Sequence, residues 1–381
     1  MRVVWVAMLS CAAAVASAHA GPVWTMQDSG TTAGLHGIDS VNESVAWASG
    51  AGGTVLRTVD SGAHWSRCAT PDAAKDGATL DFRGVQAWDA QIAIAMASGP
   101  GAKSRLYKTT DGCKSWTLLY KIPENSRNSF ACAFFHGMPE PPVHNQGFGL
   151  LLGEPVDGEF AVSETRNGGT TWMTVGNPAL DAPPGSAAFA ASNSCIAGFG
   201  GATYDFVAGG TSGSFLMRLT YQGNYWLNDG SPLIRLWDKE ALPLAANAET
   251  AGARSISEYV SYGKSRRKEG PQPFSLREVV VGGNSAKPND TNGVAVWTDD
   301  GGKHWKRAEK PPHGFRSAVQ YSESLNAWIT VGPNGSDISR DDGRTWQPLG
   351  NGSWNALSLP FAVGPDGRIG RLNAAALTAG K

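Results

Sequence analysis

The chain has 381 residues, of which 41% are hydrophobic and 17% are charged, and its formal net charge at pH 7 is −1. This near-neutral balance argues against a protein that binds nucleic acid or a membrane surface, because such proteins normally carry a basic surplus. Length alone suggests more than one domain. The 48 glycines and 14 tryptophans instead favour many short strands joined by tight turns, and a repetitive chain of this kind can grow around one axis as a single domain.

Residues 1–20 have the features of a secretory signal peptide. Arg2 provides the positive start, residues 3–15 form an apolar run, and Ala18-His19-Ala20 is a small-residue cleavage site. The run is shorter than the ~20 residues that a membrane helix needs, and no later segment is long enough, so we expect no membrane span. We expect cleavage after Ala20 and a periplasmic or secreted mature protein; the alternative is a buried N-terminal strand.

Four cysteines remain after the signal peptide, which contains Cys11. An even number in an exported protein permits two disulfides, and the spacing leaves all three connectivities open. No CxxC pair is present, so the cysteines do not indicate a zinc site. The four are Cys68, Cys113, Cys132 and Cys195.

A short pattern recurs along the chain: Ser or Thr, any residue, Asp, any residue, Gly, two further residues and Trp. The Asp carboxylate can accept hydrogen bonds from backbone N–H groups just downstream, and Gly permits the positive φ of a tight turn. We therefore interpret Asp60, Asp111, Asp300 and Asp341 as turn-forming rather than catalytic. Complete copies occupy 58–65, 298–305 and 339–346, degraded copies occupy 109–116 and 165–172, and a weaker copy occupies 219–226.

A similar sequence, which predicts three short strands, precedes the copies, as residues 36–58 and 315–339 illustrate. The Trp of each copy then opens a fourth strand. Four antiparallel strands at a period of about 40–50 residues are typical of a β-propeller blade. In the long interval before Trp305, we expect an inner strand at 254–260, a second strand at 276–281 and a basic surface loop at 263–268.

The two ends of the chain predict how the propeller closes. Six units end at a Trp, and a seventh over residues 354–372 has three strands and no box. Residues 23–26 predict a strand that belongs to no unit of its own. Paired with 368–372, it would be the fourth strand of the seventh unit and would cover an exposed sheet edge. We predict an all-β fold: one domain over 21–373, a seven-bladed β-propeller of four-stranded antiparallel blades closed by the N-terminal strand, and a tail over 374–381.

These boxes resemble the Asp-box, or BNR-repeat, propellers known from sialidases. The chain is also similar to bacterial propellers grouped with the photosystem II stability and assembly factors, over nearly the whole mature chain. This second resemblance implies a non-enzymatic assembly scaffold, whereas related proteins are often labelled glycosyl hydrolase or oxidoreductase. It is carried by Gly153-Glu154-Pro155-Val156-Asp157-Gly158, Phe189-Ala190-Ala191-Ser192, Val281-Gly282-Gly283, Ser317-Ala318-Val319 and the run 331–337.

Alignment of the inner strands places three arginines, a histidine and an asparagine at one depth around the central channel. Converging guanidinium groups suit a carboxylate or phosphate, so we predict an anionic ligand or an acidic protein partner at the channel mouth. The alternative is that each arginine pairs with an acid such as Glu154, Asp157 or Glu258 and lines a wet channel. The predicted ligand-binding residues are His36, Arg83, Arg254, Arg316 and Asn355.

An enzymatic alternative is a sialidase-like glycoside hydrolase. Its acid and base would be Glu154 and Asp157, although the sequence lacks the N-terminal arginine motif of sialidases. No nicotinamide or flavin fingerprint and no metal-ligand spacing is present, so we expect no cofactor and no metal. We favour a non-enzymatic binding propeller, and we expect a monomer.

Overall fold

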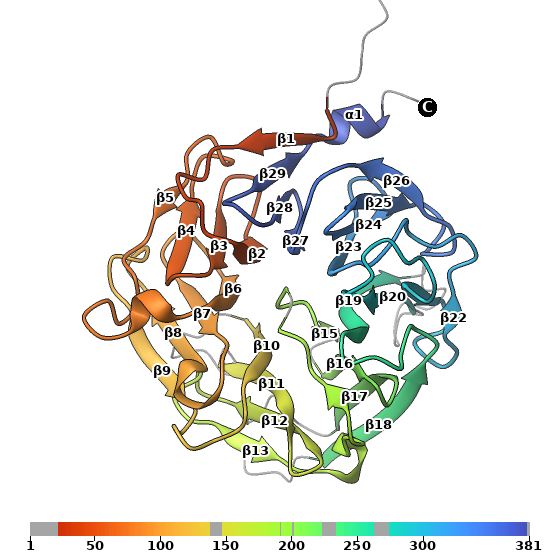
Figure 1. The fold of residues 1–381 in the computed structure, drawn as a ribbon, viewed down its shortest axis with the longest axis horizontal. Helices are drawn as coiled ribbons and strands as arrows, with labels where there is room; N and C mark the ends of the chain where they lie inside the picture. The colour runs from red at the N-terminus through yellow and green to blue at the C-terminus, as the bar shows by residue number, and fades with distance from the viewer. Residues whose placement is uncertain are drawn as a thin grey trace, which may run out of the picture.

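Strands make up almost all of the regular structure in the computed structural model, which describes residues 22–137, 147–190, 192–199, 202–222, 234–262 and 274–378. Short antiparallel sheets are arranged around a central axis, so the fold is a β-propeller (Figure 1). The predicted signal peptide, the basic loop 263–268 and the second half of the weak box copy lie outside the described residues.

Five sheets in the described part of the chain have four strands each. Four of these sheets follow chain order from the innermost strand to the outermost. The first two consist of β2 (Leu35–Ser40), β3 (Ala46–Gly50), β4 (Thr54–Thr58) and β5 (Ser66–Arg67), and of β6 (Phe82–Ala87), β7 (Ala93–Ala97), β8 (Arg105–Thr109) and β9 (Thr117–Lys121). The others consist of β10 (Phe130–His136), β11 (Phe148–Val156), β12 (Glu159–Thr165) and β13 (Met173–Val175), and of β23 (Ala318–Ser322), β24 (Ala327–Gly332), β25 (Gly335–Ser339) and β26 (Gln347–Gly350).

The fifth four-stranded sheet combines both ends of the chain. The strand β1 (Trp24–Gln27) pairs antiparallel with β29 (Ile369–Leu372), in a register that sets Trp24 opposite Leu372. The remaining strands of this sheet are β28 (Phe361–Val363) and β27 (Ala356–Ser358). A short helix, α1 (Ala374–Thr378), follows β29.

A further sheet has nine strands rather than the four that the repeat predicts. It joins two repeat units through the single pair Gly209↔Gly252. A Cβ on Gly209 would lie 2.5 Å from the Gly252 Cα, so the two backbones can approach only because both residues are glycine. Its strands are β14 (Ser186–Ala187), β15 (Ile196–Phe199), β16 (Thr203–Gly210), β17 (Ser214–Gln222), β18 (Ile234–Leu242), β19 (Ala251–Tyr262), β20 (Phe274–Asn284), β21 (Ala295–Thr298) and β22 (Lys306–Arg307).

The box turns connect the third and fourth strands of a sheet and share one pattern of hydrogen bonds. In the box 58–65, the Thr58 hydroxyl donates to Asp60 Oδ1 (2.8 Å), and the backbone N–H of His64 donates to the same oxygen (2.9 Å). The degraded copies keep this pattern: Asn167 Oδ1 accepts from the N–H of Thr171 (2.9 Å). At the glycine position, Cys113 has a φ of 65°. The outer strand begins directly after the Trp of each described box.

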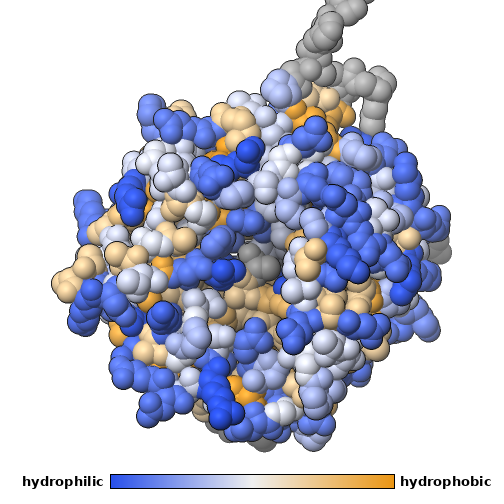
Figure 2. Space-filling model, viewed as in Figure 1, coloured by the Kyte–Doolittle hydropathy of each residue, from blue (hydrophilic) through white to orange (hydrophobic). Residues whose placement is uncertain are grey.

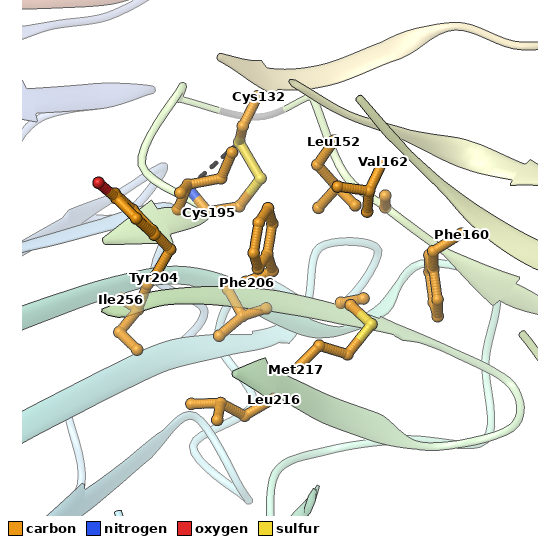
Figure 3. Close-up of a cluster of buried hydrophobic side chains, with 14 of the residues drawn as sticks. Cys132, Leu152, Phe160, Val162, Cys195, Tyr204, Phe206, Leu216, Met217 and Ile256 are labelled. Carbon is orange, nitrogen blue, oxygen red and sulfur yellow. Dashed lines mark hydrogen bonds between the residues drawn. A yellow bond between two sulfur atoms is a disulfide. The ribbon is translucent and has the colours of Figure 1, made fainter. Parts of the chain in front are cut away.

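The core lies between neighbouring sheets, and two disulfides cross these interfaces. Leu152 from the sheet of β10–β13, Phe206 and Met217 from β16 and β17, and Ile256 from β19 are buried together beside the Cys132–Cys195 disulfide (Figure 3). The second disulfide joins Cys68 to Cys113. The structure therefore selects one of the three connectivities that the sequence left open.

Candidate functional site

A polar cavity of about 520 Å³ lies where the innermost strands meet. Its lining comes from several sheets, and we call it the central cavity. Figure 2 shows that this face of the ring is hollowed at its centre. The volume falls within the range of small-ligand sites. The lining includes His36 on β2, Arg83 on β6, Glu154 on β11, Phe189 before β15, Arg254 on β19 and Asn355 before β27.

Four of the five predicted ligand-binding residues line this cavity: His36, Arg83, Arg254 and Asn355. They lie far apart in sequence, but each belongs to an innermost strand or to the residues just before one. Strands that start at the same face place equivalent residues at one depth around the axis. Asn355 is held by its Nδ2, which donates to the Leu35 carbonyl (2.8 Å).

Arg83 belongs to an ionic network that includes a carboxylate missed by the inner-strand alignment. Its Nε donates to Asp81 Oδ2 (2.8 Å), and its Nη1 donates to the Ala190 carbonyl (3.0 Å). The other oxygen of Asp81 lies 2.8 Å from His36 Nδ1. Burial alone would raise the pKa of Asp81, but the hydrogen bonds and charges of His36 and Arg83 lower it below its ordinary value. Arg83 thus already has a counter-charge.

Arg254 is a buried cation that forms no hydrogen bond to an acid within the described ranges of the chain. Its side chain is enclosed by aromatic rings: the guanidinium carbon lies 3.2 Å from the ring centroid of Phe189 and 5.5 Å from that of Phe315. Nη2 donates to the Thr250 carbonyl (2.7 Å), whereas the buried Nε has no hydrogen-bond partner among the described residues. Burial lowers the pKa of Arg254 to about 9, and the charge of Glu154 acts in the opposite direction.

Glu154 lines the central cavity together with Arg254, and the two charges interact. Burial raises its pKa, while the N–H of Ala188, which donates to Oε2 at 3.1 Å, and the charge of Arg254 lower it. The two side chains act on each other through their charges, and no hydrogen bond joins them in the described part of the chain. An anion that enters the cavity would meet an incompletely neutralised Arg254.

The prediction that three arginines face the channel is wrong for Arg316, which does not line the cavity. Its side chain is fully buried and forms an ion pair with Asp337, to which Nε donates at 2.7 Å. Nη1 donates to Asn334 Oδ1 (2.6 Å). The side chain thus turns toward β25 and its preceding turn, and only its neighbours Phe315 and Ser317 line the cavity. The reason is energetic, because a buried acid such as Asp337 requires a paired cation.

The two carboxylates suggested as acid and base of a glycoside hydrolase do not lie together in the cavity. Glu154 lines the cavity, but Asp157 lies in the exposed turn between β11 and β12 with a φ of 52°. Glu258, the third acid suggested as an arginine partner, does not line the cavity either. Among the described residues, no group of three His, Cys, Asp or Glu side chains could hold a metal ion. No helix in this part of the chain is long and apolar enough to cross a membrane.

Phe189, Phe315 and Asp81 are site residues that reasoning from the inner-strand register missed. Phe189 belongs to the run 189–192, which indicated only the resemblance to the assembly-factor propellers, and Asp81 lies two residues before Arg83. Residues two apart in an extended segment point to the same face, so the acidic residue two positions before Arg83 could have been identified as its neighbour. No comparable local signal marks the two phenylalanines as neighbours of Arg254.

The fold and this cavity define the protein's class: a β-propeller with a polar cavity where its inner strands meet. No protein-family model and no curated protein matches this chain. The solved structure of YCF48 bound to D1 peptide is similar, with a TM-score of 0.56 and 17% identity over 92% of this chain and 97% of that chain. YCF48 from Cyanidioschyzon merolae has the same TM-score of 0.56 and 17% identity over 93% and 99%. At this identity the likeness establishes the fold alone.

Proposed function

We propose that this protein is an exported, non-enzymatic binding propeller that takes an acidic segment of a protein partner into the central cavity. The observation that carries the proposal is Arg254, a buried cation at the cavity whose Nε has no hydrogen-bond partner among the described residues. A carboxylate in the central cavity would add a counter-charge and accept charge-assisted hydrogen bonds from the guanidinium group. His36, Arg83 and Asn355 would provide further polar contacts.

The fold comparison supports a peptide as ligand. A structure of a similar propeller is described as YCF48 bound to D1 peptide, which is an instance of peptide binding on this fold. The near-neutral net charge of −1 is also compatible with a local cationic site rather than a broad basic surface. The signal-peptide features of residues 1–20 support a periplasmic or secreted location.

The arrangement of the carboxylates favours binding over glycoside hydrolysis. A glycosidase needs an acid and a second carboxylate on opposite sides of the scissile bond. Glu154 lines the central cavity without Asp157, and Asp81 is held in contacts with His36 and Arg83. Aryl glycosides and sialosides should therefore show no turnover above that of a Glu154→Gln control; turnover that this control abolishes would overturn the proposal.

We also propose that the ring has seven blades and that β1 closes it. The pairing of β1 with β29 supplies the fourth strand to β27–β29. Division of the nine-stranded sheet at the single Gly209↔Gly252 pair gives one unit ending at β18 and another beginning at β19. Both divisions follow the repeat period of the sequence.

Calorimetry with two synthetic peptides tests the binding site. A decapeptide of alternating Glu and Gly should bind, and its Gln-Gly counterpart should not. Because a hydrogen bond to a charged group contributes about 1.5–3 kcal/mol, Arg254→Ala should weaken binding about tenfold or more. Arg83→Ala should weaken it as well.

Arg277→Ala is the matched control for Arg83→Ala. Both side chains are 37% exposed and paired with one Asp, but Arg277 does not line the central cavity. This variant should bind the Glu-Gly peptide as the wild type does. No binding by the wild type, or equal binding by Arg254→Ala, would overturn the proposal.

A further inference from the structure

A segment of the chain crosses the middle of the ring before β15. We call residues 189, 190 and 192–194 the crossing segment; Figure 1 shows the chain here as a light-green loop that enters the centre. Asn193 Oδ1 accepts a hydrogen bond from the N–H of Ala133 on β10 (2.8 Å). Ser192 Oγ donates to the Ser317 carbonyl before β23 (3.0 Å). The segment thus connects its own sheet to sheets on other sides of the axis.

The tip of Asn193 also reaches the inner strand β6. A Cβ on Gly84 would lie 2.7 Å from the Asn193 side-chain carbon, so the segment fits against this strand because the residue there is glycine. Asn193 itself adopts a φ of 54°, a conformation that asparagine tolerates better than most residues. The contacts on several sheets fix the place of the crossing segment.

The same segment contacts both arginines of the central cavity. The carbonyl of Ala190 accepts from Arg83 Nη1 (3.0 Å). The ring of Phe189 lies against the Arg254 guanidinium at 3.2 Å. A guanidinium stacked on a ring can still donate hydrogen bonds from its edge, and the buried Nε of Arg254 has no hydrogen-bond partner in the described part of the chain.

A disulfide anchors the C-terminal end of the crossing segment. Cys195 follows Ser194 directly and is bonded to Cys132 on β10. Both sulfur-bearing residues are buried. On the other side, the Ser194 carbonyl accepts from the N–H of Ile256 (2.9 Å), which lies on the strand that carries Arg254.

We propose that the crossing segment is the positioning element of the binding site: Phe189 and Ala190 set the directions of Arg254 and Arg83, and the Cys132–Cys195 disulfide maintains this arrangement. The inference rests on the proposed function and adds the residues that make the site selective for an anion. Phe189 acts through Arg254 and is a positioning residue. Without its ring, the guanidinium would sample directions that do not point its edge into the cavity.

A double-mutant cycle tests the role of Phe189 with the Glu-Gly decapeptide. Phe189→Leu keeps an apolar side chain but removes the ring, and it should weaken binding about threefold to tenfold, the range expected for a partly buried cation–π contact. In an Arg254→Ala background, Phe189→Leu should have no further effect. A side chain that merely supports the fold would weaken binding by the same factor in both backgrounds.

The two disulfides provide a matched comparison. Cys132→Ala with Cys195→Ala should weaken peptide binding several-fold at a temperature well below its melting transition. Cys68→Ala with Cys113→Ala, which also removes a bond between neighbouring sheets, should leave binding unchanged. If the first variant does not fold, the Phe189 cycle still decides the question.

The outcomes separate this inference from the proposed function. Failure of the wild type to bind the peptide overturns the proposed function and this inference with it. Wild-type binding together with unchanged affinity of Phe189→Leu overturns the positioning role alone. Additive effects in the double-mutant cycle also overturn it.

Discussion

At the scale of single residues, a cluster of buried charged side chains outside the central cavity lies within the nine-stranded sheet. Arg218 is shared by two fully buried acids: Nε donates to Asp205 Oδ1 (2.7 Å) and Nη2 to Glu278 Oε1 (2.9 Å). A third acid, Glu258, has a buried oxygen without a hydrogen-bond partner among the described residues. Burial, and after it the charge of Asp205, raise the pKa of Glu258 to about 8, while the charge of Arg218 acts in the opposite direction.

This cluster makes the stability of the protein depend on pH. The folded state binds the Glu258 proton more tightly than the unfolded chain does, so its contribution is fully present below the unfolded pKa of about 4.3 and is lost as pH rises toward 8. Glu258→Gln cannot ionise. It should therefore raise the free energy of unfolding by more than ~1 kcal/mol at pH 8, and by less at pH 5.

Urea unfolding at pH 5 and pH 8 at constant ionic strength measures this difference. Glu323→Gln is the control, because Glu323 lies in an exposed turn and its replacement should change stability equally little at both pH values. A Glu258→Gln variant with the same stability increment at pH 5 and pH 8 would contradict the prediction.

At the scale of elements, the box turns hold the outer strand to the rest of each sheet. In the box 339–346, Asp341 accepts hydrogen bonds from the backbone N–H of Thr345 (2.9 Å), its hydroxyl (2.6 Å) and the Ser339 hydroxyl (2.8 Å). Trp346 directly precedes β26 and is buried. Turn and strand are thus one local unit.

Asp341→Ala should lower the free energy of unfolding by about 1–2 kcal/mol, because it leaves the donors of this turn without their acceptor. Asp341→Asn should cost less, since Asn167 accepts the equivalent backbone hydrogen bond in another box. Chemical denaturation measures both values. Peptide binding should be unchanged in both variants; a large loss of affinity in Asp341→Ala would show that the boxes act on the central cavity.

At the scale of the whole molecule, the two ends of the chain share one sheet. Trp24 on β1 is buried, lies 5.2 Å from Trp354 between ring centroids, and donates from Nε1 to Ser336 Oγ in the neighbouring sheet (2.9 Å). The strand therefore contacts its own sheet and the next one. Its removal would expose the edge of β29.

Deletion of residues 22–30 should destabilise the entire ring rather than one end. Loss of a buried aromatic residue alone costs about 3–5 kcal/mol, so the melting temperature should fall by about 5–10 °C or more while the transition stays single. Scanning calorimetry measures both features. Truncation after residue 378 is the control and should have little effect, whereas an unchanged melting temperature for the deletion would contradict the proposed closure.

Interactions within a few residues explain why the sequence predicts so much of this fold. A box turn is made by side chains and N–H groups within one short segment, so its residue types are visible in the sequence. Repetition at a fixed period then indicates the propeller. The common depth of His36, Arg83, Arg254 and Asn355 follows from the same repeat, and the structure places them at one cavity, although their ligand-binding role stays a prediction.

Contacts between distant parts of the chain were decided by the tertiary structure alone. Arg316 has the same place in the repeat as Arg254, but Asp337 is close enough to pair with it, and such a partner depends on packing rather than on spacing. Two further contacts likewise join segments that are distant in the sequence: the stacking of Phe189 on Arg254 and the disulfide between Cys132 and Cys195. Local patterns repeat and can be recognised, whereas these pairs form once, where the ring brings their strands together.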